Sequence, residues 1–319
     1  MTRTLRLGTR RSKLAMTQSG MVAAALTAAT GHAVELVEIT TYGDTSQATN
    51  ELLSQIGGTG VFVNALREAL LRGEVDFVVH SLKDLPTAAA EGLSLAAVPE
   101  REDVRDVLVA RDGRKLADLP AGARIGTGSN RRAAQLRIAR PDLEVVPVRG
   151  NVDTRVGFVE SGKLDAVVLA YAGLNRLGRI AEATDLLDPA DFLPCPGQGA
   201  LGVECRADDA EMSGLLAPLD HAPTRAAVVA ERALLATLEA GCSAPVGGYA
   251  LPRHDDEREL IVTGIVASAD PNPTGAPASV RGSLTGPVEQ AARLGAELAD
   301  RLLAQGAAAL MTQQLGEAQ

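Results

Sequence analysis

The chain has 319 residues, a formal net charge of −9, 46% hydrophobic residues and 22% charged residues. This composition is typical of a soluble globular protein, and the length predicts two or three domains. The acidic balance argues against a nucleic-acid-binding protein, because a phosphate backbone is bound by a broadly basic face. With 2% aromatic residues and no Trp, an aromatic platform for stacked bases is also excluded.

The N-terminal segment combines basic residues with an Ala-rich stretch, a pattern that would also fit an export signal. Residues 17–20 interrupt the apolar stretch, however, and no small-residue cleavage site follows. Apolar residues between Leu14 and Ala29 recur at helical spacing. We therefore expect an amphipathic helix over residues 13–30 of a cytoplasmic chain. We expect no membrane association, since no apolar run is long enough to span a bilayer.

The first two thirds of the chain alternate short apolar segments with helical patterns, which is typical of βα units and a mostly parallel sheet. The expected strands are residues 5–8, 34–40, 75–80, 93–98, 107–110, 124–126, 144–148, 165–170 and 200–205. The expected helices are residues 13–30, 61–72, 130–140, 152–161 and 208–217.

After about residue 218 the pattern changes to that of a small separate α+β domain. It predicts a helix over residues 223–240 that Gly241 ends, strands over 246–251, 259–267 and 278–284, and a helix over 288–303. Residues 270–275 are expected to form a surface hairpin loop, because they combine Pro, Asn and Gly.

Two segments recur in the same order along the chain. RLGT at residues 6–9 is repeated as RIGT at 124–127, and GEVDFVV at 73–79 is repeated as GKLDAVV at 162–168. Two matches in register predict duplicated lobes, each opening with a strand, a glycine turn and a helix. Two such lobes facing each other would form a cleft that receives ligand groups from both sides.

Arginines concentrate after glycine-rich turns in the second of these lobes. The cluster consists of Arg131, Arg132, Arg149, Arg155 and Arg176. In GTGSNRR (126–132) the glycines allow close approach of an anion to the start of a helix, and arginine forks suit carboxylates. The pattern therefore predicts a site for a small polyanion. A capped helix start with solvated arginines, or a general preference for Arg over Lys, would also explain it.

Two further motifs contain side chains that could take part in a reaction. In HSLKDLP (80–86) the neighbours Lys83 and Asp84 follow a buried strand, where a carboxylate can move protons while the lysine pairs with an acid. A surface turn with an ion pair is the alternative. Cys242 follows a helix among small residues, which fits a modified cysteine, although an inert buried cysteine is commoner. Neither Cys195, Cys205 and Cys242 nor the dispersed histidines show metal-ligand spacing.

Taken together, the motifs resemble those of the hydroxymethylbilane synthase (porphobilinogen deaminase) family, over nearly the whole chain. They are GTRRSKLA, TYGD, GGTGVF, VHSLKDLP, EREDVRDVLV, GTGSNRR, RGNVDTR, LAYAGLNRLG, LPCPGQGALGVECR and ERALLATLEAGCSAPVGGYA. The resemblance implies an α/β fold with two periplasmic-binding-protein-like lobes around a cleft. Their sheets would be mixed and mostly parallel, and a small α+β C-terminal domain would follow. Lobe 1 would comprise residues 1–99 and 200–217, lobe 2 residues 100–199, and the C-terminal domain residues 218–319.

The resemblance also implies an enzyme that joins four porphobilinogen units head to tail, releases ammonia at each addition, and frees hydroxymethylbilane by hydrolysis. Cys242 matches the cysteine that holds a dipyrromethane cofactor, and Asp84 matches the catalytic carboxylate. The residues implied to bind cofactor or substrate are Arg10, Ser12, Phe62, Lys83, Thr127, Ser129, Arg131, Arg132, Arg149, Arg155, Arg176 and Gln198. The enzyme is expected to be a monomer without metal, nucleic acid or membrane partners.

Several positions depart from the family pattern. Thr59 replaces a lysine in the glycine loop, and Gly128 and Asn130 replace a serine and a leucine beside the arginines. Lys13 stands where proline is frequent, and Cys195-Pro196 stands where Ala-Val is common. From the residues alone, a two-lobed polycarboxylate-binding module without turnover is the main alternative, and a phosphosugar or nucleotide enzyme is a second. A Cys242→Ala substitution distinguishes the binding module from the synthase, because a receptor would keep its affinity whereas the synthase would lose cofactor assembly and activity. Tight binding of ATP in a calorimetric titration would support the nucleotide enzyme.

Overall fold

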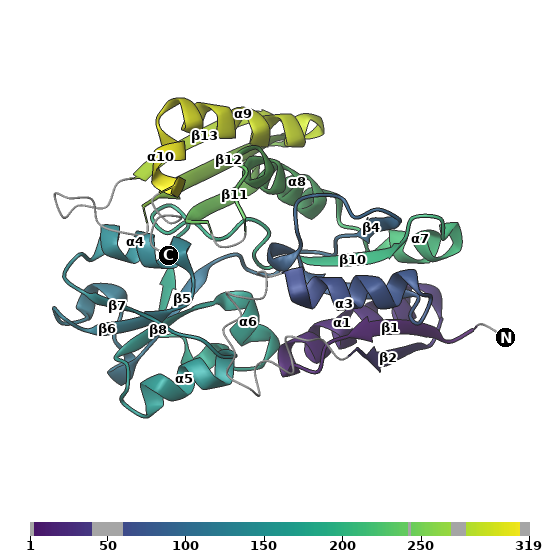
Figure 1. Ribbon diagram of the computed structural model, residues 1–319, viewed down its shortest axis with the longest axis horizontal. Coiled ribbons are helices and arrows are strands. Elements are labelled where there is room, and N and C mark those ends of the chain that lie inside the picture. Colours follow the sequence, from purple (N-terminus) through teal and green to yellow (C-terminus); the bar gives the residue numbers. More distant parts are fainter. Residues whose placement is uncertain (1–2, 40–59, 242–243, 269–278, 313–319) are drawn as a thin grey trace. The chain divides into compact units, whose positions relative to one another are not determined.

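The computed structural model describes residues 3–39, 60–241, 244–268 and 279–312 (Figure 1). The chain divides into two compact units, residues 1–102 with 199–225 and residues 103–198 with 226–319. Within the described ranges, no helix combines the length and the apolar character needed to cross a membrane.

The first unit contains a five-stranded sheet with the order β2-β1-β3-β10-β4. Its strands are β1 (Leu5–Thr9), β2 (Val34–Glu38), β3 (Phe77–Ser81), β4 (Leu93–Ala97) and β10 (Leu201–Arg206). β1 pairs in parallel with β2 and β3, whereas β10 is antiparallel to both β3 and β4. The sheet is therefore mixed, and all its strands except β10 run in one direction.

Helices cover both faces of this sheet. α1 (Lys13–Thr30) and α7 (Ala210–Leu216) lie over the face that contains Leu7 and Phe77, and α3 (Gly60–Leu71) lies over the face that contains Val78. α1 begins at Ser12, whose side chain accepts a hydrogen bond from the Ala15 N–H, and ends at Gly31 with a φ of 74°. The predicted helix over residues 13–30 is confirmed, and its buried face makes it part of the core.

The second unit contains a sheet of the same kind, with the order β7-β6-β8-β5-β9. Its strands are β5 (Asp106–Ala110), β6 (Arg124–Thr127), β7 (Glu144–Pro147), β8 (Ala166–Ala170) and β9 (Asp185–Leu187). β6 pairs in parallel with β7 and β8, and β5 is antiparallel to β8 and β9. Its helices are α4 (Asn130–Ala139), α5 (Val152–Glu160) and α6 (Tyr171–Arg176). The expected α/β class with mixed, mostly parallel sheets is confirmed.

The repeated segments occupy equivalent places in the two sheets. In the first sheet the Arg6 N–H donates to Asp76 Oδ2 at 2.8 Å, and the Asp76 N–H donates to the Arg6 carbonyl. In the second sheet Arg124 and Asp165 exchange the same two bonds, again with a 2.8 Å contact to the carboxylate. The sequence repeat therefore corresponds to a repeated structural motif, which we call the Arg–Asp clasp.

The rest of the second unit is a three-stranded antiparallel sheet with helices packed on it (Figure 1). It consists of β11 (Val246–Arg253), β12 (Asp256–Ala267) and β13 (Ser279–Pro287), with α8 (Ala222–Thr237), α9 (Ala291–Ala304) and α10 (Ala307–Thr312). Leu234, Leu298 and Leu302 form its core. A Cβ on Gly295 would lie 2.0 Å from the Ala230 carbonyl oxygen, so glycine allows α9 to approach α8 closely.

The helix predicted over residues 223–240 ends earlier than expected. Its last helical residue is Thr237, and Glu239 adopts a φ of 51°. The N–H groups of Glu239 and Ala240 donate to the carbonyls of Ala236 and Leu235, which is the Schellman pattern. Gly241 was therefore the wrong stop residue. The sequence analysis also missed α6, β9 and α10, and the loop predicted over residues 270–275 lies outside the described residues.

Candidate functional site

The glycine turn GTGSNRR connects β6 to α4 and places its polar side chains at the start of that helix. The Ser129 N–H donates to Thr127 Oγ1 at 3.2 Å, and Ser129 Oγ accepts from the Arg132 N–H at 3.4 Å. Ser129 is therefore the N-cap of α4, as the spacing of the motif predicts. This cap fixes the direction in which the next residues, Arg131 and Arg132, project.

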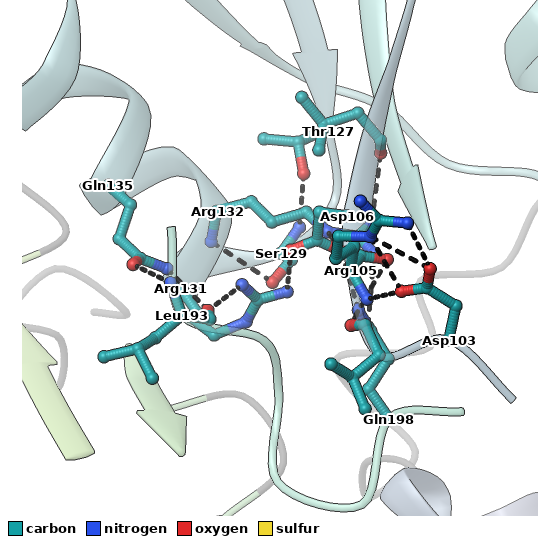
Figure 2. A network of polar contacts seen from close by, with 12 residues as sticks. Asp103, Arg105, Asp106, Thr127, Ser129, Arg131, Arg132, Gln135, Leu193 and Gln198 are labelled. Atoms are coloured by element: carbon teal, nitrogen blue, oxygen red, sulfur yellow. Dashed lines mark hydrogen bonds and ion pairs between the residues drawn. The ribbon is translucent and has the colours of Figure 1, made fainter. Parts of the chain in front are cut away.

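Arg131 and Arg132 converge on a buried carboxylate, Asp106 (Figure 2). Arg131 Nη2 lies 2.7 Å from Asp106 Oδ2. Arg132 donates to Oδ1 of the same carboxylate through Nη2 at 2.7 Å and through Nε at 3.0 Å. The side chain of Asp106 is 0% exposed, and those of Arg131 and Arg132 are 3% and 7% exposed. Two cations at a helix N-terminus oppose the helix dipole, and Asp106 offsets this repulsion.

Carbonyl groups accept further hydrogen bonds from both guanidinium groups. Arg131 Nη1 donates to the Leu193 carbonyl at 2.5 Å, and Arg132 Nη1 donates to the Val168 carbonyl at 3.1 Å. Gln135 holds the same Leu193 peptide through two hydrogen bonds of 2.7 and 3.0 Å. The two arginines are thus fixed by the protein itself, in a rigid arrangement that the sequence does not reveal.

Gln198 completes this cluster from the LPCPGQ segment. Its Nε2 donates to Asp106 Oδ1 at 2.9 Å and to the Val104 carbonyl at 2.7 Å. The preceding Gly197 has a φ of 75°, and its N–H donates to the buried Glu231 at 2.6 Å. Glycine is needed at Gly197 because this conformation is unfavourable for other residues.

The charges of the cluster do not cancel. Burial alone would raise the pKa of Asp106, but Arg131 and Arg132 lower it to about 2, so this carboxylate is ionised near neutral pH. Arg155, on α5, has a pKa lowered first by burial and then by the positive charge of Arg132. Its Nε is buried without a hydrogen-bond partner among the described residues. Two arginines thus pair with one carboxylate and a third, Arg155, lies close enough to repel Arg132, which leaves positive charge for an anionic ligand.

Gly128 is a departure from the family pattern that the structure explains. A Cβ at this position would lie 2.6 Å from the Val148 carbonyl oxygen and 3.6 Å from Arg155 Nη2. A serine would therefore require the Val148 peptide to move, whereas glycine lets the turns after β6 and β7 lie side by side. Of the other predicted arginines, Arg149 is exposed in the turn after β7 and Arg176 is half-buried at the end of α6.

The other predicted site residues belong to the first unit. Lys83 and Asp84 lie on a single 3-10 turn, Leu82–Asp84, directly after β3. Asp84 is exposed and Lys83 is half-buried. Arg10 follows β1, and Ser12 caps α1 through its side chain rather than facing solvent freely. The carboxylate of Asp84 is therefore accessible to a small molecule.

Two predicted residues cannot be placed in a site. Cys242 lies outside the described residues, five positions after the last helical residue of α8. Phe62 belongs to α3, but its side chain is outside the described part. Among the described residues, no group of three or more His, Cys, Asp or Glu side chains could hold a metal ion.

The sequence analysis missed Asp106 and Gln135. Asp106 opens the apolar strand of RDVLVA, so an acidic residue directly before a fully buried strand was the available signal. Such a residue is costly to bury unless cations accompany it, and the arginines of GTGSNRR are the cations that do so. For Gln135 the sequence holds no comparable signal.

Comparisons with known proteins agree over nearly the whole chain. The family model described as "Porphobilinogen deaminase, dipyromethane cofactor binding domain" matches residues 5–214, and "Porphobilinogen deaminase, C-terminal domain" matches residues 225–304. "Porphobilinogen deaminase 1" of Streptomyces coelicolor is 63% identical, covering 96% of this chain and 97% of the relative. "Porphobilinogen deaminase" of Thermobifida fusca is 57% identical over 95% and 94% of the two chains. A periplasmic substrate-binding protein from Coxiella burnetii, a solved structure, is 15% identical with a TM-score of 0.43 over 71% and 94% of the chains.

Proposed function

The chain belongs to the porphobilinogen deaminase family, and we propose that its arginine cluster holds acidic pyrroles while Asp84 handles the protons of their condensation. It is a transferase of tetrapyrrole biosynthesis with a dipyrromethane-binding domain. The alternative of a binding module without turnover is not favoured, because relatives that match 96% and 95% of the chain are named as deaminases.

The observation that carries this proposal is the excess positive charge around Asp106. Arg131 and Arg132 are paired with Asp106, whereas Arg155 lies beside them with a buried Nε that has no hydrogen-bond partner among the described residues. Each pyrrole of the substrate and of dipyrromethane has an acetate and a propionate group. A cluster of this charge fits such a polyanion, because arginine forks bind carboxylates with two parallel hydrogen bonds.

Four further residues would assist this binding. Thr127 and Ser129 place hydroxyl groups at the N-terminus of α4, where anions are favoured. Arg149 follows β7, and Arg176 is the last residue of α6. Arg10, Ser12, Lys83 and Phe62, which belong to the first unit, would also bind cofactor or substrate, and Gln198 would hold Asp106 in place. These assignments come from the family resemblance together with the positions of the residues.

Asp84 would perform the proton chemistry of each addition. A carboxylate in this exposed position can accept the pyrrole N–H of porphobilinogen and stabilise the positive charge that develops as ammonia leaves. A carbon–carbon bond then forms between two pyrrole units, and the ring proton released at the new bond passes to a base such as Asp84. After four additions, hydrolysis frees the linear tetrapyrrole.

Cys242 would hold the dipyrromethane through a thioether. When bound, this group supplies the terminal pyrrole carbon to which the first substrate unit is joined. In the sequence, Cys242 comes after the Schellman turn that ends α8, in which Glu239 adopts a left-handed conformation. The division into lobes 1–99 with 200–217, 100–199 and 218–319, the monomeric state and the cytoplasmic location remain predictions.

The intact mass of freshly purified protein tests the cofactor. We expect an excess equal to two linked pyrrole units, absent from a Cys242→Ser variant and present in a matched Cys195→Ser variant. Bare polypeptide mass that stays bare after porphobilinogen is added would contradict the proposal.

The role of Asp84 is tested by Asp84→Asn, with Asp118→Asn as its control. Asp118 is likewise exposed and likewise ends a 3-10 turn, Leu116–Asp118, but the proposal gives it no role. We expect kcat to fall on the order of a hundredfold or more for Asp84→Asn, because acid–base groups contribute factors of about this size, and to stay unchanged for Asp118→Asn. A near-normal kcat for Asp84→Asn would refute the assignment.

A further inference from the structure

The turn that contains Asp84 is anchored on strand β10. The Leu82 N–H donates to the Ala200 carbonyl at 3.0 Å, and the side chains of Leu82 and Leu85 are 1% and 3% exposed. A Cβ on Gly202 would lie 2.8 Å from Leu82 Cδ1, so these leucines cover β10 where glycine leaves room for them. Asp84 is thus an exposed residue between two buried anchors.

The next residue on the same face of β10 is Glu204, because side chains alternate along a strand. Glu204 is 3% exposed, and Arg67 from α3 binds it with both ends of its fork, at 2.9 Å for Nε and 2.7 Å for Nη2. His80, four residues before Asp84, places Nε2 3.2 Å from Glu204 Oε2, although off the line of a straight hydrogen bond. We call Arg67, Glu204 and His80 the buried triad.

Within the buried triad, the negative charge of Glu204 is stabilised by its two neighbours, Arg67 and His80. Burial would raise the pKa of Glu204, but His80 and Arg67 lower it to about 2, so the carboxylate is ionised near neutral pH. An ion pair in such a position contributes little net stability compared with apolar side chains of similar volume. The stability of the sheet therefore gives no reason for charged residues here.

The duplicated sheet shows that the fold does not require the triad. Aligning the repeats pairs Arg67 with Val156 and His80 with Leu169, and the strand registers pair Glu204 with Val109. These three residues of the second sheet, Val109, Val156 and Leu169, are all buried in one apolar cluster. The two sheets thus share one strand arrangement, but the first has charged or polar residues beside the Asp84 turn where the second has apolar ones.

We propose that Glu204, held by Arg67, is a positioning residue that fixes His80 and thereby the orientation of the Asp84 turn. This inference rests on the proposed role of Asp84. A misplacement of a catalytic group by about 1 Å costs on the order of a hundredfold in rate, so a fixed turn is needed beside an exposed carboxylate. The triad supplies a polar contact at the end of β3, where apolar side chains would allow the turn to shift.

The first test replaces the triad by apolar residues, as in the second sheet: Arg67→Met, Glu204→Val and His80→Leu in one chain. Methionine keeps the length of the arginine stem. No buried charge is left unpaired, so we expect a urea midpoint at or above that of the parent protein. We expect kcat, per molecule that contains the two-pyrrole adduct, to fall on the order of tenfold or more, with KM changed less than about threefold.

A second pair of variants tests the inference even if the triple variant does not fold. His80→Gln keeps an N–H close to the position of Nε2, whereas His80→Phe fills the space without a donor. We expect kcat close to the parent value for His80→Gln and a fall on the order of tenfold for His80→Phe. Glu68→Gln, on the exposed side of α3 next to Arg67, is the control and should leave kcat unchanged.

The outcomes separate the inference from the proposed function. If the triple variant or His80→Phe folds and keeps the parent kcat, the positioning role is wrong, whatever Asp84→Asn shows. If His80→Gln and His80→Phe lose kcat equally, the polar contact of His80 is not what matters and the inference also fails. If Asp84→Asn keeps its kcat, the proposed function of Asp84 fails first.

Discussion

The two five-stranded sheets share their strand order and the Arg–Asp clasp, but they bury their charges at different places. Apart from Asp76 of the clasp, the first sheet buries the carboxylate of Glu204, in the middle of β10, and the second buries that of Asp106, at the start of β5. By the register of strand pairing, Glu204 corresponds to Val109 and Asp106 corresponds to Leu201. Glu204 and Asp106 therefore each correspond to a buried apolar residue in the other sheet.

The cationic partners follow the same rule. Counted from the N-caps Ser12 and Ser129, the helix positions of Arg131 and Arg132 correspond to Leu14 and Ala15 in the first unit. In these two clusters a helix of the same unit supplies the counter-charge: Arg67 lies on α3, and Arg131 and Arg132 lie on α4. Apart from the clasp, the two sheets thus differ in where they bury charge: beside the turn that contains Asp84 in the first sheet, and beside the GTGSNRR turn in the second.

Asp106→Asn is the substitution expected to have the largest effect on the charge cluster of the second sheet. It leaves Arg131 and Arg132 buried without a carboxylate, and removing one partner of a buried ion pair costs about 3–5 kcal/mol. We expect a lower urea midpoint and little dipyrromethane adduct in the intact mass.

The control copies the apolar residues of the first sheet: Asp106→Leu, Arg131→Leu and Arg132→Ala together. This variant should recover much of the stability, because it removes Asp106 together with the two arginines that pair with it, but it should stay without adduct. Recovery of the adduct together with the stability would show that the arginines serve only the fold.

The pH dependence of stability tests whether the arginines of the second sheet keep Asp106 ionised. The pKa of Asp106 falls from 3.8 to about 2 on folding, so its contribution is complete above pH 3.8 and is lost as the pH falls through about 2. This shift corresponds to about 2 kcal/mol. The Asp106→Leu, Arg131→Leu, Arg132→Ala variant should therefore lose less stability between pH 4 and pH 2 than the parent does, as measured by urea unfolding at each pH. Equal losses would mean that Asp106 is not held ionised by its arginines.

The Arg–Asp clasps allow a matched test of burial. Asp76 is 2% exposed and accepts hydrogen bonds from the Arg6 backbone at 2.8 Å and side chain at 3.0 Å. Asp165 is half-buried and accepts one from the Arg124 backbone at 2.8 Å. Asp76→Asn should cost about 2 kcal/mol and Asp165→Asn about 1 kcal/mol, because hydrogen bonds to charged groups are the stronger ones. Hydrogen exchange resolved by sheet measures both, and the reverse order would contradict the assignment of the stronger clasp to the first sheet.

Local patterns explain why so much of the fold was predictable. Ser12 and Gly31 bracket the helix over residues 13–30 with capping signals, and the repeated RLGT and RIGT segments mark β1 and β6. β9 and α6 were missed because three and six residues are too short to show a period.

The charge clusters could not be predicted, because their partners are distant in sequence. Arg67 and Glu204 are 137 residues apart, and Arg132 and Asp106 are 26 residues apart. An isolated acid in an apolar strand indicates only that some cation must reach it, and not which one. The arginines of the site were recognised from their motif, whereas Asp106 and the buried triad follow only from the three-dimensional pairing of strands and helices.

The smallest expected effects concern the glycines at equivalent positions in β1 and β6. A Cβ on Gly126 would lie 2.5 Å from Leu164 Cδ1, whereas the closest atom to a Cβ on Gly8 is Val78 Cγ1 at 3.0 Å. The difference arises because Leu164 in the second sheet replaces the shorter Val75 of the first. Overpacking costs about 1–3 kcal/mol, so Gly126→Ala should lower the free energy of unfolding within that range and Gly8→Ala by less. When Gly126→Ala is combined with Leu164→Val, its cost in unfolding free energy should fall to that of Gly8→Ala, since the shorter side chain removes the clash. An unchanged cost in that double variant, measured by urea unfolding, would mean that the backbone of β6 and not Leu164 sets the limit.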